Sequence, residues 1–365
     1  MLLLATCAPP MGDLQLPPAP TAAAPEIRIG LLVGASTLEV TGDSGALVQD
    51  ADGNSAGAIE PGSFWRVRSA AGLVDAGAAG RWQVTGQQQL TFQPRVAGGW
   101  LRVGDRPYRG RLTIARDRTG LTVVNVVSLE DYLAGVVAAE MGRRDSTEGQ
   151  ALAAQAIVSR TFALRNLGKR ATEGFDLYAT VADMVYAGAS AEYGAASAAV
   201  ATTSGQILTW QGVPIDAFFF STCAGQTAAG TDVFAAADRP YLQSIRDVDS
   251  EGQAYCRISP RFRWREEWSI EQLRGVLKST LPSASAVTAE AAAGVRGVTV
   301  SGRTASDRVS RVTIGLRNGD IVVEGPAIRR VLRPVADAVL RSAIFQLSEV
   351  REGGQLRRLV ADGAG

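Results

Sequence analysis

Histidine is missing from this chain altogether: none of its 365 residues is a histidine. Without an imidazole there is no Ser-His-Asp triad, no Cys-His pair and no HExxH zinc helix. The sequence also lacks a GxxxxGK[ST] phosphate loop and a GxGxxG dinucleotide fingerprint. If the protein is an enzyme, carboxylates must therefore carry its acid-base chemistry.

Excess charge and long apolar runs are missing as well. The formal net charge is +1 and there is no long basic run, which argues against a nucleic acid or an anionic membrane held by charge. The apolar run that opens "MLLLATCAPP" is far shorter than the roughly 20 residues of a membrane-spanning helix. With 46% hydrophobic residues, the chain can still bury a large core in two or three domains.

The first 25 residues look like the end of an export signal followed by a Pro/Ala-rich tether. The Leu-Ala-Thr-Cys string resembles a bacterial lipobox, in which Cys7 would become the lipidated N-terminus. The alternative is that Cys7 is an ordinary residue in a frayed terminus. We therefore expect an exported cell-envelope protein whose contact with the membrane would be a lipid anchor.

The rest of the chain predicts an α+β fold: a β-rich N-terminal region at 26–104, a mixed α+β domain with a central substrate cleft at 105–350, and a tail at 351–365. Short alternating runs separated by turns indicate the β-rich part. "RLTIARDRTGLTVVNVV" predicts a hairpin that turns at Arg116 to Gly120, and we expect a buried strand at Ala217 to Phe220. Ser128 with Asp131 has the pattern of a capping box, and Thr147 with Gln150 forms another at the start of a helix expected from about Thr147 to Gly168. A short helix is expected to begin at Ser269.

One residue does not fit the helix predicted over 128–142. On a helical projection, Glu140 falls on the apolar stripe formed by Leu129, Leu133 and Val136. A buried lone carboxylate is costly, so Glu140 is either in an ion pair with Arg160 or Arg143, at a rim, or in a cleft with its pKa raised. The last state suits a general acid.

Several sequence blocks, in one order, resemble the SpoIID/LytB family of bacterial cell-wall proteins. These blocks span about residues 105 to 347 and include "NVVSLEDYLAGVVAAEMG", "ALAAQAIVSRTFAL", "VYAG", "TSGQILTWQGVPIDAFFFSTCAGQT", "PYLQSIRD" and "SPRFRW".

The resemblance implies a lytic transglycosylase that cleaves the β-1,4 bond after N-acetylmuramic acid in peptidoglycan glycan strands and leaves a 1,6-anhydro end. The catalytic glutamate of the family matches Glu140. One carboxyl group suffices, because the C6 hydroxyl of the sugar attacks the anomeric carbon, and no metal or cofactor is needed. The alternative is a non-catalytic partner that binds peptidoglycan and enhances a cell-wall amidase.

Other matched positions are candidates for substrate binding. Each has a structural alternative: an ion pair for Arg160, a core position for Tyr186 and a tight turn for the loop at 221–225. The candidates are Gln155, Arg160, Tyr186, Ser221, Thr222, Gly225 and Gln226.

The chain departs from the family where other members often carry histidine, at Phe220 and sometimes at Gln226 and Arg261. Some members bind zinc through cysteine and histidine in this neighbourhood. Here only Cys223 and Cys256 remain, and two thiolates without histidine make a poor zinc site. A disulfide suits an exported protein better; unlinked buried thiols and a metal site are the alternatives.

Overall fold

The computed structural model describes residues 25–78, 80–234, 239–335 and 338–365. The chain divides into two compact units, Met1–Phe218 and Phe219–Gly365, which we call unit 1 and unit 2 and describe separately. Cys7 and the expected tether lie outside the described residues. No helix in the described part of the chain is long and apolar enough to cross a membrane.

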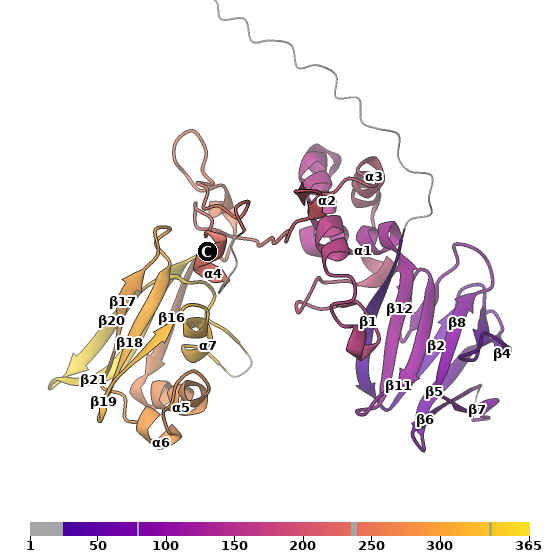
Figure 1. Cartoon of the computed structure of the whole chain (residues 1–365), viewed down its shortest axis with the longest axis horizontal. Coiled ribbons are helices and arrows are strands. Elements are labelled where there is room, and N and C mark those ends of the chain that lie inside the picture. The colour runs from indigo at the N-terminus through magenta and orange to yellow at the C-terminus, as the bar shows by residue number, and fades with distance from the viewer. Residues whose placement is uncertain (1–24, 79, 235–238, 336–337) are drawn as a thin grey trace, which may run out of the picture. The chain divides into compact units, whose positions relative to one another are not determined.

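Unit 1 is built on two antiparallel sheets that pack against each other through β8 and β11 on one side and β6 and β9 on the other (Figure 1). The seven-stranded sheet has the order β13 (Leu177–Tyr178), β1 (Glu26–Ala35), β12 (Leu121–Ser128), β11 (Arg111–Arg116), β8 (Gln89–Pro94), β3 (Ala46–Gln49) and β4 (Ser55–Ile59). The six-stranded sheet has the order β10 (Arg106–Tyr108), β9 (Leu101–Val103), β2 (Thr37–Gly42), β5 (Phe64–Ala70), β6 (Leu73–Gly77) and β7 (Val84–Gln87). Only the short pairing of β13 with β1 is parallel among these strands.

Strands from both sides of residue 104 share the larger sheet, because β1 pairs with β12 and β8 pairs with β11. The hairpin predicted at Arg116 to Gly120 is confirmed as β11–β12. Residues 121–127 of β12 are all buried, so this strand is covered on both faces. Its last residue, Ser128, is also the residue that caps the next helix, so β12 fixes where that helix starts.

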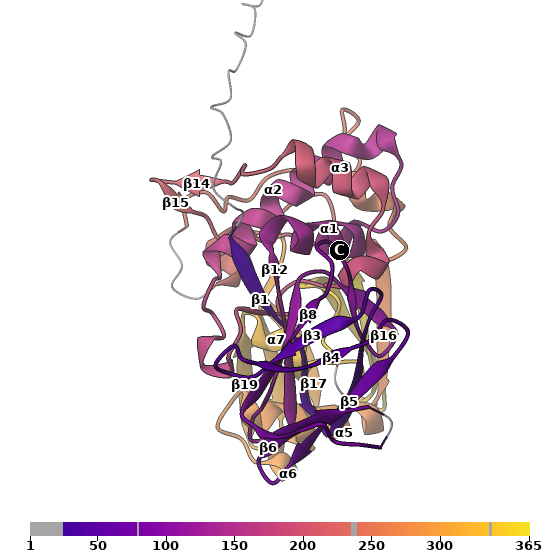
Figure 2. The same ribbon diagram turned by 90° about the vertical axis from the view of Figure 1, so that its right-hand side faces the viewer.

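Three helices of unit 1 lie together at one end of its larger sheet (Figures 1 and 2). They are α1 (Leu129–Met141), α2 (Gly149–Arg165) and α3 (Gly194–Thr202), accompanied by 3₁₀ turns at Ser146–Glu148, Ala171–Glu173 and Gly188–Ala191. The predicted cap of α1 is confirmed: the Asp131 N–H donates to Ser128 Oγ at 3.1 Å. The start predicted for α2 is wrong, because Thr147 Oγ donates to Asp145 instead of capping the helix, which begins two residues later and ends before Gly168. A small hairpin, β14 (Thr209–Trp210) with β15 (Val213–Pro214), follows.

Unit 2 contains two three-stranded sheets and short helices around one hydrophobic core. One sheet has the order β16 (Arg263–Ser269), β21 (Gln355–Ala364) and β20 (Ile344–Glu352), and the other β17 (Gly297–Arg303), β18 (Val309–Leu316) and β19 (Gly319–Glu324). The helical elements are α4 (Gly230–Val233), α5 (Ile270–Thr280), α6 (Ala289–Ala292), α7 (Ala327–Val331) and 3₁₀ turns at Tyr255–Ile258 and Leu281–Ser283. The helix predicted to begin at Ser269 is confirmed as α5, and Ser269 forms a capping box with Gln272.

The strand expected at Ala217 to Phe220 is absent from the structure, and this prediction is wrong. The segment pairs with no sheet, and its aromatic side chains are not sequestered, since Phe220 is 60% exposed. Strand-like composition did not suffice, because strand propensity takes effect only where a partner strand pairs with the segment. The α+β class and the β-rich N-terminal part are confirmed, whereas a central substrate cleft is not shown.

Candidate functional site

Helix α1 is a core helix and does not have a single apolar stripe. Every residue from Tyr132 to Ala138 is buried, so all faces of its middle are covered by protein. Glu140 stands just after this buried stretch, and its side chain is half-buried. The expected intrusion into an apolar stripe is therefore a position at the edge of a buried segment.

Glu140 is held by a backbone group. Its Oε1 accepts the N–H of Val185 at 2.8 Å, and no described residue donates to its Oε2. The two arginines considered as partners are engaged elsewhere: Arg160 with Glu130, and Arg143 over the ring of Tyr193. In the part of the chain that the structure describes, no Lys or Arg forms an ion pair with Glu140. One carboxyl oxygen is fixed and the other is available.

The segment that carries Val185 is anchored by Asp183, whose side chain is fully buried. This carboxylate accepts the Tyr178 N–H at 2.8 Å and the Lys169 ammonium at 2.5 Å, and the Arg170 Nε lies 3.5 Å away. A buried carboxylate with a backbone donor and two cations is a strong local anchor. Asp183 thus fixes the loop that donates to Glu140. The sequence did not predict the roles of Val185 and Asp183. A backbone N–H group has no sequence signal, and Asp183 lies outside the recognised "VYAG" block, separated from it by Met184.

Tyr132 contributes a buried hydroxyl to the same neighbourhood. Its oxygen has no hydrogen-bond partner among the described residues. Burial, and then the negative charges of its neighbours, Asp183 and Glu140 included, raise the pKa of Tyr132 well above its ordinary value. The phenol therefore stays neutral beside the two carboxylates.

Tyr186 is a core residue, and the substrate-contact expectation for it is corrected. Its ring is buried against Tyr132, with ring centroids 4.9 Å apart, and its hydroxyl donates to the Asn125 Oδ1 at 3.0 Å. Gly135 of α1 permits this close packing, because a Cβ there would lie 2.7 Å from the Tyr186 ring. Tyr186 thus holds the 183–186 segment against α1.

Arg160 is also corrected to a structural role. It is 1% exposed, and its guanidinium donates to both carboxylate oxygens of Glu130 at 2.8 and 2.7 Å. The remaining N–H groups reach the carbonyls of Val200 and Gln206 at 3.2 and 3.1 Å. With its donors used inside the α1–α2–α3 packing, Arg160 has none to offer a sugar. Gln155 is different: it is half-buried and donates to Ser159 Oγ at 3.0 Å, and its role toward substrate stays a prediction.

The other candidate residues belong to unit 2 and form a loop of their own. Ser221 is exposed, Thr222 and Gln226 are half-buried, and Gly225 is buried with φ of +93°. Gln226 pairs with Arg246 in an isolated β-bridge. Their roles toward substrate stay predictions. Ala224 also has positive φ, +58°, a conformation that favours glycine.

Cys223 and Cys256 meet at this loop but are not bonded. Their sulfur atoms are 3.7 Å apart, well beyond a disulfide of about 2.05 Å, and both are free thiols in the structure. Burial, followed by the hydrogen bond that the thiol donates to Asp247, raises the pKa of Cys223 to about 12. The disulfide is thus not formed here, although the two residues are paired in space.

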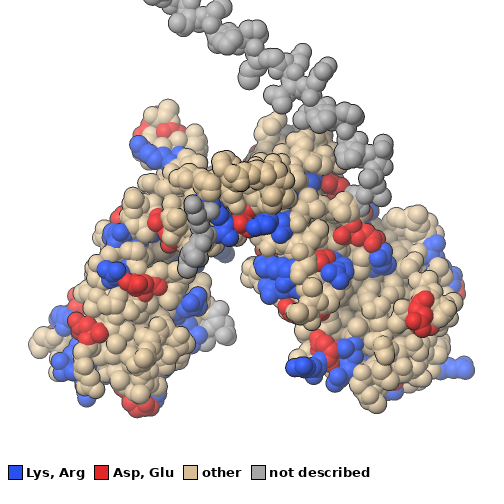
Figure 3. Space-filling model, viewed as in Figure 1, with Lys and Arg blue, Asp and Glu red and all other residues tan. Residues whose placement is uncertain are grey.

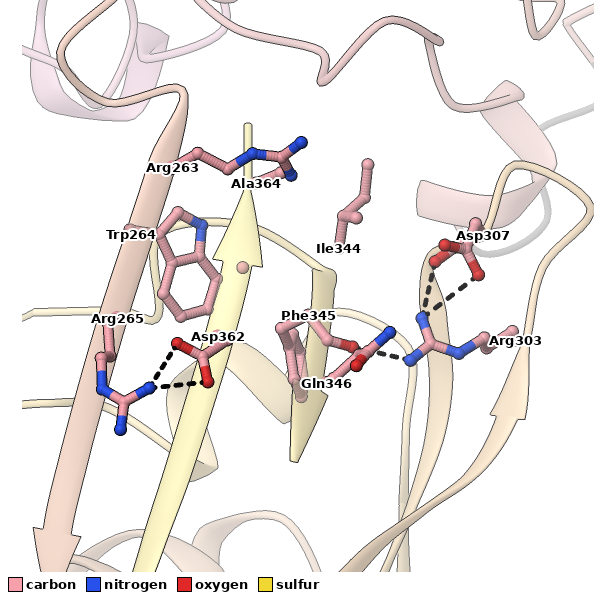
Figure 4. Close-up of a pocket in the computed structure, with 11 residues that line it drawn as sticks. Arg263, Trp264, Arg265, Arg303, Asp307, Ile344, Phe345, Gln346, Asp362 and Ala364 are labelled. Carbon is pink, nitrogen blue, oxygen red and sulfur yellow. Dashed lines mark hydrogen bonds and ion pairs between the residues drawn. The ribbon is translucent and has the colours of Figure 1, made fainter. Parts of the chain in front are cut away.

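Of three cavities in the described residues that Glu140 does not line, two belong to unit 1, of about 330 and 310 Å³, and one of about 550 Å³ belongs to unit 2. In the latter, Arg265 is paired with Asp362, and Arg303 with Asp307 and the Phe345 carbonyl (Figure 4). On the face of the molecule in Figure 3, positive and negative side chains are interspersed. Neither view gives a strongly charged binding surface.

Comparison with known proteins connects this geometry to a family. The family described as SpoIID, Stage II sporulation protein, matches residues 117–210, and a domain of unknown function, DUF8618, matches residues 253–365. Glu140, Gln155, Arg160 and Tyr186 all fall within the first match.

Three relatives share 31% identity with the chain. Stage II sporulation protein D of Bacillus subtilis (strain 168) aligns over 227 residues, which are 56% of this chain and 62% of that protein. The protein of the same name from Bacillus amyloliquefaciens aligns over 222 residues, with the same two shares. An uncharacterised protein, BHWA1_00569, of Brachyspira hyodysenteriae aligns over 171 residues, 47% of this chain and 44% of that protein. The chain therefore covers less than two thirds of each relative. The α1–α2 region that carries Glu140 lies within the match, and over this region the chain is similar to the SpoIID family.

Proposed function

We propose that this protein is a peptidoglycan lytic transglycosylase that uses Glu140 as its single general acid and base. Similarity to the SpoIID family over residues 117–210 supports a role in the cell wall or in sporulation. The observation that carries the finer proposal is the state of Glu140: half-buried, fixed through Oε1 by one backbone N–H, and unpaired with any described cation. A carboxyl group neutralised by an arginine would be a poor proton donor, and this one is not neutralised that way.

The chemistry follows from the two carboxyl oxygens. Val185 fixes the rotation of the carboxyl group through Oε1, so that Oε2 can face the glycosidic oxygen. Protonated Glu140 gives its proton to that leaving oxygen while the C6 hydroxyl of the muramic acid attacks the anomeric carbon. The resulting carboxylate accepts the C6 hydroxyl proton, so a bond to O6 replaces the glycosidic bond. Ordinary glycosidases need a second carboxylate because water or the enzyme itself attacks.

The proposed partners are glycan strands, freed of stem peptides, and a cooperating amidase. The proposed location is the cell envelope, after export. A lipid anchor on Cys7 belongs to the same proposal, and its residue is outside the described part of the chain.

The test is product analysis with purified protein and peptide-free glycan strands. Wild type should release fragments with 1,6-anhydro-muramic ends, identified by mass spectrometry. Glu140→Gln keeps the shape and the Val185 hydrogen bond but has no proton to donate, so release should fall by at least about 100-fold, the usual scale of general acid catalysis. Its folding and glycan binding should be unchanged.

The matched control is Glu148→Gln, because Glu148 lies at the surface in an i,i+4 pair with Arg144. This variant should cleave like wild type. If wild type and Glu140→Gln bind glycan equally and neither cleaves it, the transglycosylase proposal fails and a non-catalytic amidase enhancer explains the binding.

A further inference from the structure

Unit 2 brings two thiols together from distant parts of the chain in an arrangement that distinguishes one from the other. Cys223 is buried, whereas Cys256 is half-buried in the 3₁₀ turn Tyr255–Ile258. The outer end of that turn is open to solvent, since Ile258 is 88% exposed. A molecule arriving from solvent can therefore reach Cys256 first.

Backbone N–H groups of the loop that starts at Cys223 lie close to the sulfur of Cys256. Ala224 and Gly225 both have positive φ, which turns successive N–H groups toward one side. Burial alone would raise the pKa of Cys256, but the nearby backbone N–H groups of Cys223, Gly225 and Ala224 outweigh it and lower that pKa. Since the thiolate is the nucleophile, this environment favours reaction at Cys256.

Cys223 is placed as the second thiol of a pair. It donates to Asp247 Oδ2 at 3.1 Å, and its sulfur lies 3.7 Å from that of Cys256. Closing that distance to a disulfide requires about 1.7 Å of approach. The loop is held from the other side by Arg308, whose guanidinium donates to the Gln226 carbonyl at 2.8 Å. Oxidation would therefore require a local shift of the 255–258 turn and no change in the loop.

We propose that Cys256 and Cys223 form a thiol–disulfide exchange site, with Cys256 as the attacking thiol, Cys223 as the resolving thiol and a disulfide as the co-substrate. The Cys256 thiolate attacks a sulfur of the external disulfide, forming a mixed disulfide and releasing one thiolate. Cys223 then gives its proton to the thiolate released in the first step and attacks the Cys256 sulfur, which releases the second thiolate. Two protein thiols and one external disulfide become one protein disulfide and two external thiols.

The consequence is a covalent clamp between the loop at 221–226 and the 255–258 turn. This proposal does not depend on the transglycosylase activity, because it concerns unit 2 alone and its readout is the state of the sulfurs.

The experiment uses the full chain carrying Cys7→Ser, so that only the two thiols report. The reduced protein is exposed to oxidised glutathione in a buffer containing a chelator, then quenched with acid, alkylated and mapped by mass spectrometry. We expect a Cys223–Cys256 bond preceded by a glutathione adduct on Cys256. In Cys223→Ser that adduct should persist. In Cys256→Ser the buried Cys223 should react at least about tenfold more slowly.

Asp247→Asn tests the restraint on the resolving thiol. The adduct on Cys256 should form at the parental rate and convert to the internal disulfide several-fold faster, because the carboxylate that raises the pKa of Cys223 is gone. Circular dichroism checks that each variant is folded. If a variant is unfolded, the order in which the adduct and the internal disulfide form in the Cys7→Ser parent provides the test. The proposal is overturned if the two single-cysteine variants form glutathione adducts at equal rates. It is also overturned if the folded parent forms no internal disulfide under conditions in which the urea-unfolded chain does.

Discussion

The two ends of α1 each carry a glutamate, and the structure treats them in opposite ways. Glu130 at the start accepts two hydrogen bonds from the buried guanidinium of Arg160. Glu140 at the end accepts one backbone N–H and is paired with no described cation. One carboxylate serves packing and is neutralised, whereas the other is oriented and left with a free oxygen. The two glutamates therefore differ in the group that contacts each carboxylate: a buried guanidinium for Glu130 and a backbone N–H for Glu140.

The largest effect should come from breaking the neutralised end. Glu130→Ala leaves the Arg160 guanidinium buried without its counter-charge, which should lower the free energy of unfolding by about 3 kcal/mol. Urea unfolding followed by circular dichroism measures this. Glu140→Gln, the matched change at the other end, should alter it by less than about 0.5 kcal/mol. A loss below about 1 kcal/mol in Glu130→Ala would mean that the two ends do not differ in this way.

The packing that brings Val185 to Glu140 is tested by Gly135→Ala. Alanine gains about 1 kcal/mol of helix propensity, but its Cβ would overlap the Tyr186 ring at 2.7 Å and the Gly188 carbonyl at 2.9 Å. Overpacking of this kind costs about 1–3 kcal/mol, so we expect a net loss of stability in unit 1, seen by hydrogen exchange of its amides. Gly275→Ala is the control, because Gly275 lies in α5 with open space around it and should gain stability. A stabilised Gly135→Ala variant would refute the close packing of α1.

The anchoring of the loop at the unpaired end is tested by Asp183→Asn. Losing the charge weakens the bonds to Lys169 and Arg170, so the Val185 N–H should hold Glu140 less well. We expect kcat for glycan cleavage to fall about tenfold with little change in KM, which corresponds to about 1.4 kcal/mol of transition-state stabilisation. Faster hydrogen exchange at the Val185 amide should accompany it. A normal kcat with a fast-exchanging amide would separate loop order from catalysis.

Asp117 gives a third carboxylate for comparison, held by hydrogen bonds without a cation. The bond from Thr122, helped by Thr119 and Gly120, lowers the pKa of Asp117 from its ordinary 3.8 to about 2. A lowered pKa contributes stability that is present above pH 4 and is lost as the pH falls toward about 2. The melting temperature of wild type should therefore exceed that of Asp117→Asn above pH 4, and the gap should close by about pH 2. A constant gap across this range would contradict the hydrogen-bonded carboxylate.

Local signals predicted the local structure well. The cap at Ser128, the helix start at Ser269 and the β11–β12 hairpin were predicted correctly, because the residues that form each of them are a few positions apart. The short strands β3, β4, β6 and β10 were missed, since their pairing depends on neighbours elsewhere in the sheets.

The candidate site was less predictable, because its contacts connect distant residues. Arg160 reaches back 30 positions to Glu130, and the Val185 N–H reaches back 45 to Glu140. The amino-acid composition of each segment does not predict either contact. The family resemblance identified Glu140 as the candidate catalytic residue, whereas the hydrogen bond that orients its carboxyl group is seen only in the folded structure.

The first residue of α1 also sets a working distance. The Leu129 N–H donates to the Pro25 carbonyl at 2.8 Å, so the polypeptide upstream joins the fold at the beginning of this helix. Glu140 lies 11 residues further along, roughly 17 Å at 1.5 Å per residue. If the chain is anchored to a surface through residues before Pro25, the length of that upstream segment sets how far from the surface the Glu140 carboxyl group can act. Shortening or lengthening the segment would change this distance without altering the fold.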